Sequence, residues 1–238
     1  MILYYIRHGD PCYDPDSLTE LGKKQAEALA KRLINSSLDD IYSSSSIRAI
    51  QTATPTAKLY NKEIIKLEWA HESIAWNFFA KSIDGKAKTW IFRIPKYVEM
   101  FATDKVYSLR NNWYEYKGLD DNSFKEGVKF YQEKVYSFLE TLGYKYNHSK
   151  HGYDQIFENN KKIALFAHQG FFIAFLSTLL DIPYPLISLH FDMQHSGMTI
   201  IDFQNLNGTI YPKVMQLSND SHLYKENMET TYNYKFKV

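Results

Sequence analysis

Two histidines that follow short apolar runs are the residues best suited to chemistry. Ile2–Ile6 leads directly into Arg7 and His8, and Ile163–Ala167 leads into His168. Both runs have the length of a buried strand, and in an open α/β sheet ligands bind beyond the carboxyl ends of the strands. The pattern therefore predicts that both imidazoles lie at one edge of one sheet. A neutral imidazole there can act as a nucleophile near pH 7, because its ordinary pKa is about 6.5.

Arginine is scarce in this chain, which makes each arginine informative. Of the 28 basic residues only five are arginine: Arg7, Arg32, Arg48, Arg93 and Arg110. The planar guanidinium grips phosphate or carboxylate with two parallel hydrogen bonds, which a lysine ammonium cannot do. We expect Arg7, Arg48 and His168 to cradle an anion such as phosphate, with Gln169 beside them. The plainer alternative for an isolated arginine is a surface residue or the partner of a carboxylate.

The elements that must position these side chains alternate between strand and helix. Apolar residues at helical spacing predict a helix over 18–34, capped by Ser17 or Thr19, with Glu20 closing a capping box on Ser17. Further helices are expected from Ile47, from Ser123 and over 171–180, and further strands at 41–42, 63–67, 198–203 and 209–217. This alternation predicts an α/β fold, a three-layer αβα sandwich with a mostly parallel central sheet and helices on both faces.

The stretch from 73 to 122 does not follow this alternation. It holds three of the four tryptophans, together with many Phe and Tyr, and shows no clear period. Insertions set on a rigid scaffold often carry specificity. We expect one domain over 1–238, with an aromatic-rich, helical, cap-like insertion at about 73–122 that also lines the site. The alternative is a helical cap with its own small core.

Composition narrows the class of protein and its partners. The chain has 238 residues, of which 45% are hydrophobic and 23% charged, and its formal net charge is +1. These values indicate a soluble globular protein without a global field for nucleic acid or membranes. The lone Cys12 cannot form an intrachain disulfide, and the apolar run 171–180 is shorter than the roughly 20 residues of a membrane span. We expect a cytoplasmic protein with no nucleic-acid or membrane partner, and the sequence leaves its oligomeric state open.

Several motifs resemble the histidine phosphatase superfamily, the phosphoglycerate-mutase-like group, over most of the chain. The N-terminal motifs are Arg7-His8-Gly9, Leu18-Thr19-Glu20-Leu21-Gly22 and the run from Ser44 to Ala53 that contains Arg48. The C-terminal ones are the strand ending at His168 and the segment 219–223. All occur in the family's order. The resemblance implies a phosphatase in which His8 attacks phosphorus and becomes a phosphohistidine, which water then hydrolyses.

The resemblance also implies a proton donor for the leaving group. The family's donor is a Glu that follows the strand after the Arg48 helix, and both Glu68 and Glu72 stand there. We favour Glu72, because Glu68 lies nearly on the strand, where it is more easily an ordinary surface carboxylate. The expected catalytic set is therefore Arg7, His8, Arg48, Glu72 and His168.

The remaining histidines are weaker candidates. His195 and His222 are expected to be mostly structural, although His222 resembles a family position near the pocket. The others are expected at the surface or in packing: His71, His148, His151 and His190.

No group of Asp, His or Cys has the sequence spacing of metal ligands, so we expect neither a metal nor a cofactor.

Departures from the family pattern leave other functions open. Asp10 stands where Glu is more usual, Gln169 where Gly is frequent, and 73–76 replaces a common Gly-Trp-Glu-Gly signature. The favoured function is a metal-independent phosphomonoesterase, a hydrolase acting on a small organic phosphate ester. The alternatives are a phosphoglycerate-type phosphomutase and a phosphate-binding module without turnover.

Overall fold

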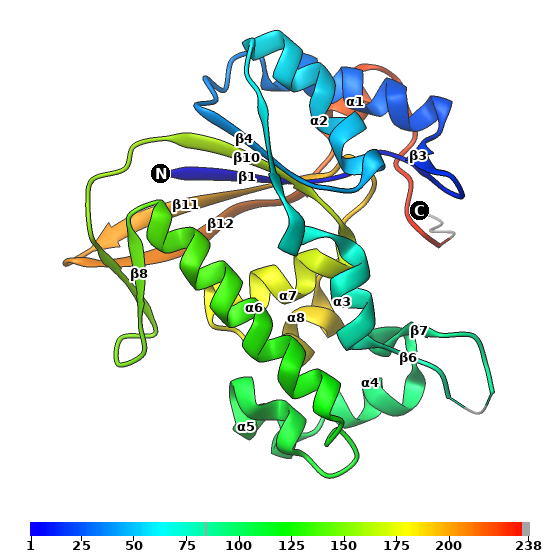
Figure 1. Cartoon of the computed structure of the whole chain (residues 1–238), viewed down its shortest axis with the longest axis vertical. Helices are drawn as coiled ribbons and strands as arrows, with labels where there is room; N and C mark the ends of the chain where they lie inside the picture. Colours follow the sequence, from blue (N-terminus) through cyan, green and yellow to red (C-terminus); the bar gives the residue numbers. More distant parts are fainter. Residues whose placement is uncertain (84, 235–238) are drawn as a thin grey trace.

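The central feature is a mixed sheet (Figure 1). The computed structural model describes residues 1–83 and 85–234, and in them this sheet has eight strands in the order β5-β4-β10-β1-β11-β12-β9-β8. Their bounds are β1 (Ile2–Arg7), β4 (Asp40–Ser44), β5 (Ile64–Leu67), β8 (Tyr144–Asn147), β9 (Gly152–Gln155), β10 (Lys162–Ala167), β11 (Met198–Leu206) and β12 (Thr209–Asn219). β1, β10, β4 and β5 are parallel, whereas β11, β12, β9 and β8 extend the sheet through antiparallel pairs.

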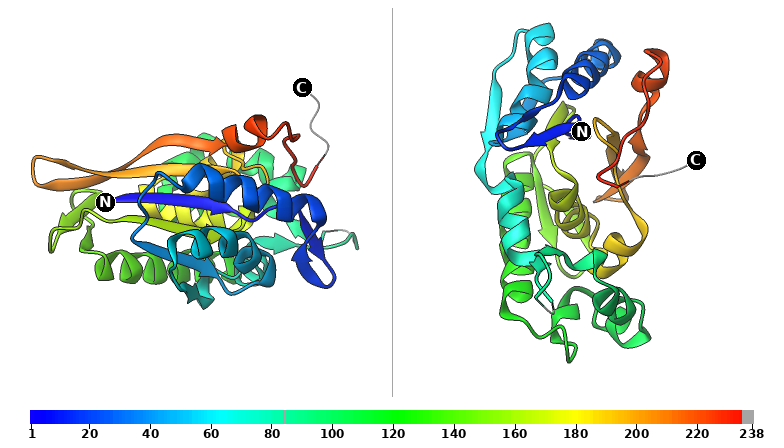
Figure 2. Two further views of the ribbon diagram at one scale, coloured as in Figure 1. Left: turned by 90° about the horizontal axis from the view of Figure 1, so that it is seen from above. Right: turned by 90° about the vertical axis from the view of Figure 1, so that its right-hand side faces the viewer.

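Helices cover both faces of this sheet (Figures 1 and 2). α1 (Glu20–Leu33) and α2 (Ile47–Tyr60) lie on one face, and α6 (Asn122–Thr141) and α7 (Gln169–Leu180) lie on the other. The short α8 (Tyr184–His190) packs beside α7, and α9 (Ser221–Lys225) packs beside α1. The predicted α/β sandwich is confirmed.

Two hydrophobic clusters, one on each face, explain why β1 and β10 are continuous apolar runs. In β1, Leu3 and Tyr5 belong to the cluster under α6 and α7, whereas Tyr4 and Ile6 belong to the cluster under α1 and α2. β10 divides its residues in the same alternating way. Successive side chains of a strand point to opposite faces, so a strand covered on both faces must be apolar throughout. Its polar residues are then confined to its ends.

The caps of the first two helices place residues of the site. Thr19 caps α1 by accepting a hydrogen bond from the Gly22 amide, so the expected capping box of Ser17 with Glu20 is wrong. Glu20 is the first residue of the helix and pairs with Lys23 instead. Ser46 caps α2 by accepting from Ala49, which puts Arg48 in the first turn as expected.

The aromatic insertion, residues 73–122, is built from short elements. They are α3 (Glu72–Phe79), β6 (Ala80–Lys81), β7 (Thr89–Trp90), α4 (Pro95–Phe101), α5 (Asp104–Leu109) and the 3-10 turns η2 (Ile91–Arg93) and η3 (Arg110–Glu115). Phe79, Trp90 and Trp113 are buried in the same hydrophobic cluster as the sheet face under α7. The insertion therefore shares its core with the sheet. The organisation of 1–238 as one domain with a cap stays a prediction.

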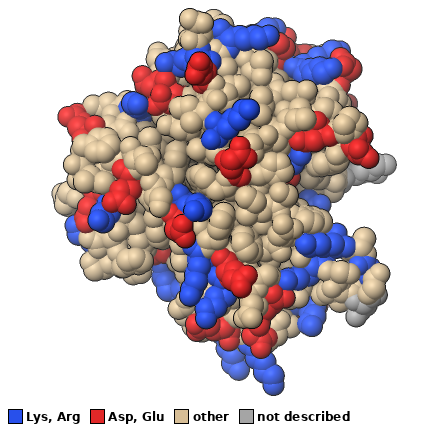
Figure 3. All heavy atoms as spheres, viewed as in Figure 1, with Lys and Arg blue, Asp and Glu red and all other residues tan. Residues whose placement is uncertain are grey.

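Two smaller features complete the fold. The chain between β1 and α1 forms a hairpin of β2 (Pro11–Tyr13) and β3 (Asp16–Leu18), and the turn η1 (Glu68–Ala70) precedes α3. Among the described residues no helix is both long and apolar enough to cross a membrane. Acidic and basic side chains are interspersed on the face seen in Figure 3, in agreement with the small net charge.

Candidate active site

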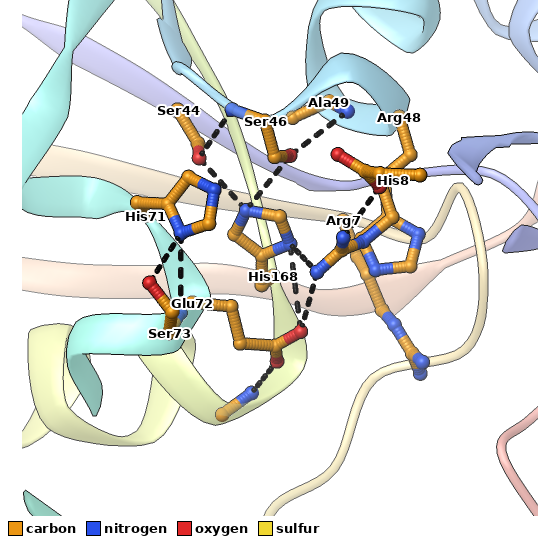
Figure 4. Close-up of polar contacts among 12 residues, drawn as sticks. Arg7, His8, Ser44, Ser46, Arg48, Ala49, His71, Glu72, Ser73 and His168 are labelled. Carbon is orange, nitrogen blue, oxygen red and sulfur yellow. Dashed lines mark hydrogen bonds and ion pairs between the residues drawn. The ribbon is translucent and has the colours of Figure 1, made fainter. Parts of the chain in front are cut away.

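The ends of three parallel strands bring the predicted residues together (Figure 4). β1 ends at Arg7 and is followed by His8, and β10 is followed by His168. β4 ends at Ser44, just before the helix that carries Arg48. The rings of His8 and His168 have their centroids 5.2 Å apart, close enough to act on one phosphorus atom. We call Arg7, His8, Arg48, Glu72 and His168 the strand-end cluster.

His8 is held in the tautomer that a nucleophile needs. Its Nδ1 lies 2.7 Å from the carbonyl oxygen of Gly9, and because a carbonyl only accepts, Nδ1 must carry the proton. The lone pair of Nε2 is therefore available for attack. Burial, followed by the neighbouring His168 and the two arginines, lowers the pKa of His8 well below its ordinary value, so the ring stays neutral.

His168 is fixed at both nitrogens. Nη2 of Arg48 donates to its Nδ1 at 3.1 Å, and because a guanidinium only donates, the ring proton lies on Nε2. Nε2 is 2.8 Å from Oγ of Ser44. Burial and the charge of Arg48 lower the pKa of His168 well below its ordinary value. A neutral His168 is thus held in one orientation, with the lone pair of Nδ1 on the side of Arg48.

Arg48 and Glu72 form an ion pair at the edge of the cluster. Arg48 contacts Oε2 of Glu72 at 2.8 Å with Nη2 and Oδ1 of Asp16 at 2.6 Å with Nη1. Burial opposes the charge of Arg48, but the two carboxylates outweigh burial and raise its pKa. Oε1 of Glu72 accepts from the amide of Gly170 at 3.0 Å. Glu72 therefore accepts a hydrogen bond from the N-terminus of α7.

Arg7 is buried without a carboxylate partner in the described part of the chain. Only 1% of it is exposed; Nη1 donates to the carbonyl of Met193, Nη2 donates to Oδ1 of Asn233 at 2.6 Å, and its buried Nε has no partner. Burying an uncompensated charge is costly. A bound anion would supply the missing opposite charge.

Gly9 and Gly170, which follow the two histidines, allow neighbouring elements to pack closely. A Cβ on Gly9 would lie 2.6 Å from the carbonyl oxygen of Gly22 in α1, and a Cβ on Gly170 would lie 2.2 Å from the Trp90 ring. Such distances leave no room for a side chain. Gly170 therefore allows the insertion to approach the N-terminus of α7.

A pocket of about 540 Å³ adjoins the strand-end cluster. Arg48 and Glu72 line it from the cluster, and Trp76, Trp90 and Arg93 line it from the insertion. Its volume falls within the range of roughly 300 to 1,000 Å³ typical of small-molecule sites. The stretch 73–122 does line the site.

Comparisons with known proteins agree with this geometry. Residues 3–76 match the family model of the histidine phosphatase superfamily (branch 1). A solved structure of Entamoeba histolytica phosphoserine phosphatase with phosphoserine is similar over 93% of this chain and 98% of that one, with 20% identity and a TM-score of 0.59. The chain has the histidine phosphatase fold. The resemblance read from the motifs is thereby confirmed.

Two other solved structures show the same similarity at low identity. The mycobacterial glucosyl-3-phosphoglycerate phosphatase is 16% identical, with a TM-score of 0.55 over 90% of this chain and 97% of that one. The α-ribazole phosphatase of Shigella flexneri is 18% identical, with a TM-score of 0.56 over 92% and 97%. No curated protein sequence matches the chain significantly.

The structure separates the two glutamates and places Gln169. Glu68 is exposed in η1 and makes no recorded contact with the cluster, whereas Glu72 lies within it. Gln169 is buried at the start of α7, and its Oε1 has no hydrogen-bond partner among residues 1–83 and 85–234. Its predicted contact with phosphate stays a prediction, as do the catalytic roles of the strand-end cluster.

Three neighbours of the cluster were missed in the sequence. The His195 ring lies 5.9 Å from that of His8, and burial, followed by the charge of Arg7, lowers the pKa of His195 to about 3. His71, expected at the surface or in packing, lines the pocket with its ring 6.2 Å from that of His168. Oδ1 of Asn233 lies 2.6 Å from Nη2 of Arg7 and 2.8 Å from Nε2 of His195.

The signals that could have found these residues are weak. His195 precedes β11, which pairs antiparallel with β1, so it returns beside the residue that follows β1. The sequence does not say which strand β11 joins. By contrast, His222 lies outside the cluster and bonds to Oγ of Ser196 at 2.9 Å, as expected for a structural residue.

The fold also brings together three side chains that lie far apart in the sequence and could act as metal ligands. Ligand atoms of His8, Glu72 and His168 lie within 4.8 Å of one another, a spacing that could hold a metal ion. The expectation that no such group exists was therefore wrong in space. However, Nη2 of Arg48 already contacts both Glu72 and His168. A fixed positive charge at that point opposes a divalent cation and favours an anion.

Proposed function

We propose that the protein is a phosphomonoesterase that hydrolyses a small organic phosphate through a phosphohistidine on His8. The observation that carries the proposal is the tautomer of His8, whose free Nε2 faces a cluster with two buried guanidinium groups. The structural neighbours support it, since they are phosphatases of phosphoserine, glucosyl-3-phosphoglycerate and α-ribazole phosphate esters.

In the first step, Nε2 of His8 forms a bond to phosphorus and the bond to the ester oxygen breaks. Arg7 and Arg48 stabilise the charge that spreads over the nonbridging oxygens, and His168 joins them when it takes up a second proton on Nδ1, which the negative charge of the bound phosphate favours. The phosphate displaces Glu72 from Arg48, and the freed carboxylate takes up the proton of the monoanionic ester and gives it to the leaving oxygen, so the product departs as a neutral alcohol. The bond from Nδ1 of His8 to Gly9 keeps the ring in place as it acquires positive charge.

In the second step, water attacks the phosphohistidine. Glu72, now a carboxylate, accepts the proton of the water, the nitrogen–phosphorus bond breaks, and inorganic phosphate leaves. His8 returns to its neutral form, and Glu72 passes its proton to the departing phosphate and becomes a carboxylate again. No metal takes part in either step, so the rate should be unchanged after treatment with a chelator.

The deciding experiment uses His8→Ala and rapid quenching. Wild-type protein mixed with labelled phosphomonoester should yield protein-bound phosphate that is stable in base and labile in acid. His8→Ala should form none and should lose on the order of 10³-fold or more in kcat. Equal turnover by His8→Ala would refute the proposal. A labelled phosphoglycerate separates the hydrolase from a mutase. A hydrolase releases the label as inorganic phosphate, whereas a mutase transfers it to the isomeric phosphoglycerate.

A further inference from the structure

The pocket beyond the strand-end cluster is much larger than a phosphate group needs. Its walls come from the β2 strand (Tyr13), the cluster (Arg48, Glu72) and the insertion (Trp76, Trp90, Arg93). Phosphate would occupy the end formed by the cluster. The remaining space must accept the leaving group, so its lining defines the chemistry of the substrate.

Two tryptophans, Trp76 and Trp90, form the apolar part of that remaining wall. The rings of Trp76 and Trp90 meet edge to face, with centroids 4.9 Å apart, and Trp90 stacks on Phe92 at 5.6 Å. The approach of Trp90 to Gly170 fixes its position against α7. Trp90 is 5% exposed and therefore nearly rigid. Preformed aromatic surfaces of this kind favour an apolar or flat ligand.

Arg93 adds a positive charge to this wall. It is exposed, and no ion pair is recorded for it within residues 1–83 and 85–234. Its guanidinium lies 5.9 Å from the ring centroids of Phe92 and of Tyr234. Burial is the main cause of the lowered pKa of Arg7, and the charge of Arg93 adds to it, so Arg93 lies within electrostatic reach of the cluster.

Arg110 shows the contrasting case within the same insertion. It lines a different pocket, and its Nη2 lies 3.7 Å from a carboxylate oxygen of Asp181. Its charge therefore already has a partner. Of the two arginines in the insertion, Arg93 alone faces the pocket beside Glu72.

We propose that the substrate is a phosphomonoester whose leaving group is an aromatic or similarly flat apolar body bearing a second anionic group. Trp76 and Trp90 contact the body, and Arg93 binds the second anion. This inference rests on the proposed function, because it concerns the leaving group of that same reaction. A guanidinium–carboxylate pair with two parallel hydrogen bonds would fix the orientation of the leaving group.

A matched pair of substrates tests the second anion. Phenyl phosphate and 4-carboxyphenyl phosphate differ by one carboxylate, and kcat/KM is measured for both with wild type, Arg93→Gln and the control Arg110→Gln. Wild type should prefer the carboxylated ester by about 10-fold, the size of a charged hydrogen bond that is partly exposed to solvent. Arg93→Gln should bring the ratio of the two kcat/KM values close to 1, and Arg110→Gln should keep the wild-type ratio.

A second variant tests the aromatic body. Trp76→Ala should lower kcat/KM for phenyl phosphate at least several-fold more than it lowers kcat/KM for a small alkyl ester such as glycerol phosphate. If Arg93→Gln keeps the preference, or wild type has none, the anion site is refuted while the phosphatase stands. If Trp76→Ala affects both esters equally, the aromatic contact is refuted. If wild type hydrolyses no phosphomonoester, the proposed function fails, and this inference fails with it.

Discussion

The strand-end cluster and the aromatic insertion are held in place by different interactions. In the cluster, polar side chains are fixed by directed hydrogen bonds, such as Nδ1 of His8 to Gly9 at 2.7 Å. In the insertion, Trp113 is wholly buried against rings, with centroids 5.5 Å from Phe101 and 5.6 Å from Tyr184. Directed bonds fix the position of single atoms, whereas ring packing fixes a shape. We therefore expect the first region to carry out the chemistry and the second to select the substrate.

The sharpest test of this division is Glu72→Gln, which changes one atom of the cluster. Loss of a general acid costs on the order of 10²- to 10⁴-fold when the leaving group is poor. We expect such a fall in kcat for an alkyl phosphate and a much smaller one for 4-nitrophenyl phosphate, whose leaving group needs little protonation.

Glu68→Gln is the matched control, since Glu68 is exposed on the adjacent turn. It should leave both rates unchanged. The assignment of the donor is reversed if Glu68→Gln loses activity on the alkyl ester and Glu72→Gln does not.

The two regions should also differ in their response to acid. The region 73–122 contains no histidine, whereas burial lowers the pKa of His222 to about 4 and that of His195 to about 3 near the strand ends. Between pH 6.5 and about 4 the unfolded chain binds protons at these positions and the folded chain does not. Stability must therefore fall as the pH falls through this window, by up to about 1.4 kcal/mol per pH unit for each such histidine.

His222→Gln isolates one of these contributions without touching the cluster. At pH 7 its activity should match that of wild type. Between pH 6.5 and 4.5 the unfolding free energy of the variant should fall by about 2 kcal/mol less than that of wild type. Urea denaturation at several pH values measures this difference. The exposed His190→Gln serves as control and should follow the wild-type curve. Parallel curves for wild type and His222→Gln would contradict the argument.

Gly170→Ala tests the contact between the two regions. The new Cβ would lie 2.2 Å from Cζ2 and 2.3 Å from Cη2 of Trp90, so α7 and the insertion must separate. Overpacking of this kind costs about 1–3 kcal/mol of unfolding free energy. Because the Gly170 amide also binds Glu72, kcat should fall as well.

Trp90→Phe provides the matching rescue, because phenylalanine lacks the fused ring. The double variant should be more stable than the sum of the single changes predicts, a coupling measurable by thermal denaturation. If the two changes in stability are strictly additive, the residue at position 170 and the ring at position 90 do not clash.

The sequence predicted the parts of the fold and site that depend on local pattern. β1 and β10 were recognised because both faces are buried, and His8 and His168 followed from the ends of those strands. Short elements such as β8 and β9 were not predicted, since four-residue strands with mixed polarity acquire their pairing only from the rest of the sheet. β11 and β12 were predicted as strands, but their antiparallel pairing with β1 and β9 was not, because it depends on the rest of the sheet.

Side chains brought in by long-range contacts were the other failure. Asn233 lies 226 positions after Arg7, and nothing in its own neighbourhood marks it as part of a site. His71 was assigned to the surface or to packing because its role depends on where α3 places it relative to His168. Motifs carry the chemistry along the chain, but only the folded chain shows what else contacts it.

The C-terminal segment contacts both regions, because Asn233 contacts the cluster and Tyr234 contacts the insertion. A change at Asn233 gives the prediction with the smallest expected effect. Oδ1 of Asn233 accepts from Arg7 and His195 at positions that a phosphate oxygen could use, while the neighbouring Tyr234 lies against Arg93. Asn233→Ala should free these donors and tighten competitive inhibition by inorganic phosphate by about 2- to 10-fold, the worth of one net hydrogen bond. The exposed Asn160→Ala should have no effect. Weaker inhibition in Asn233→Ala would instead mean that the amide itself binds phosphate, and the C-terminal segment would then belong to the strand-end cluster as a third source of ligands.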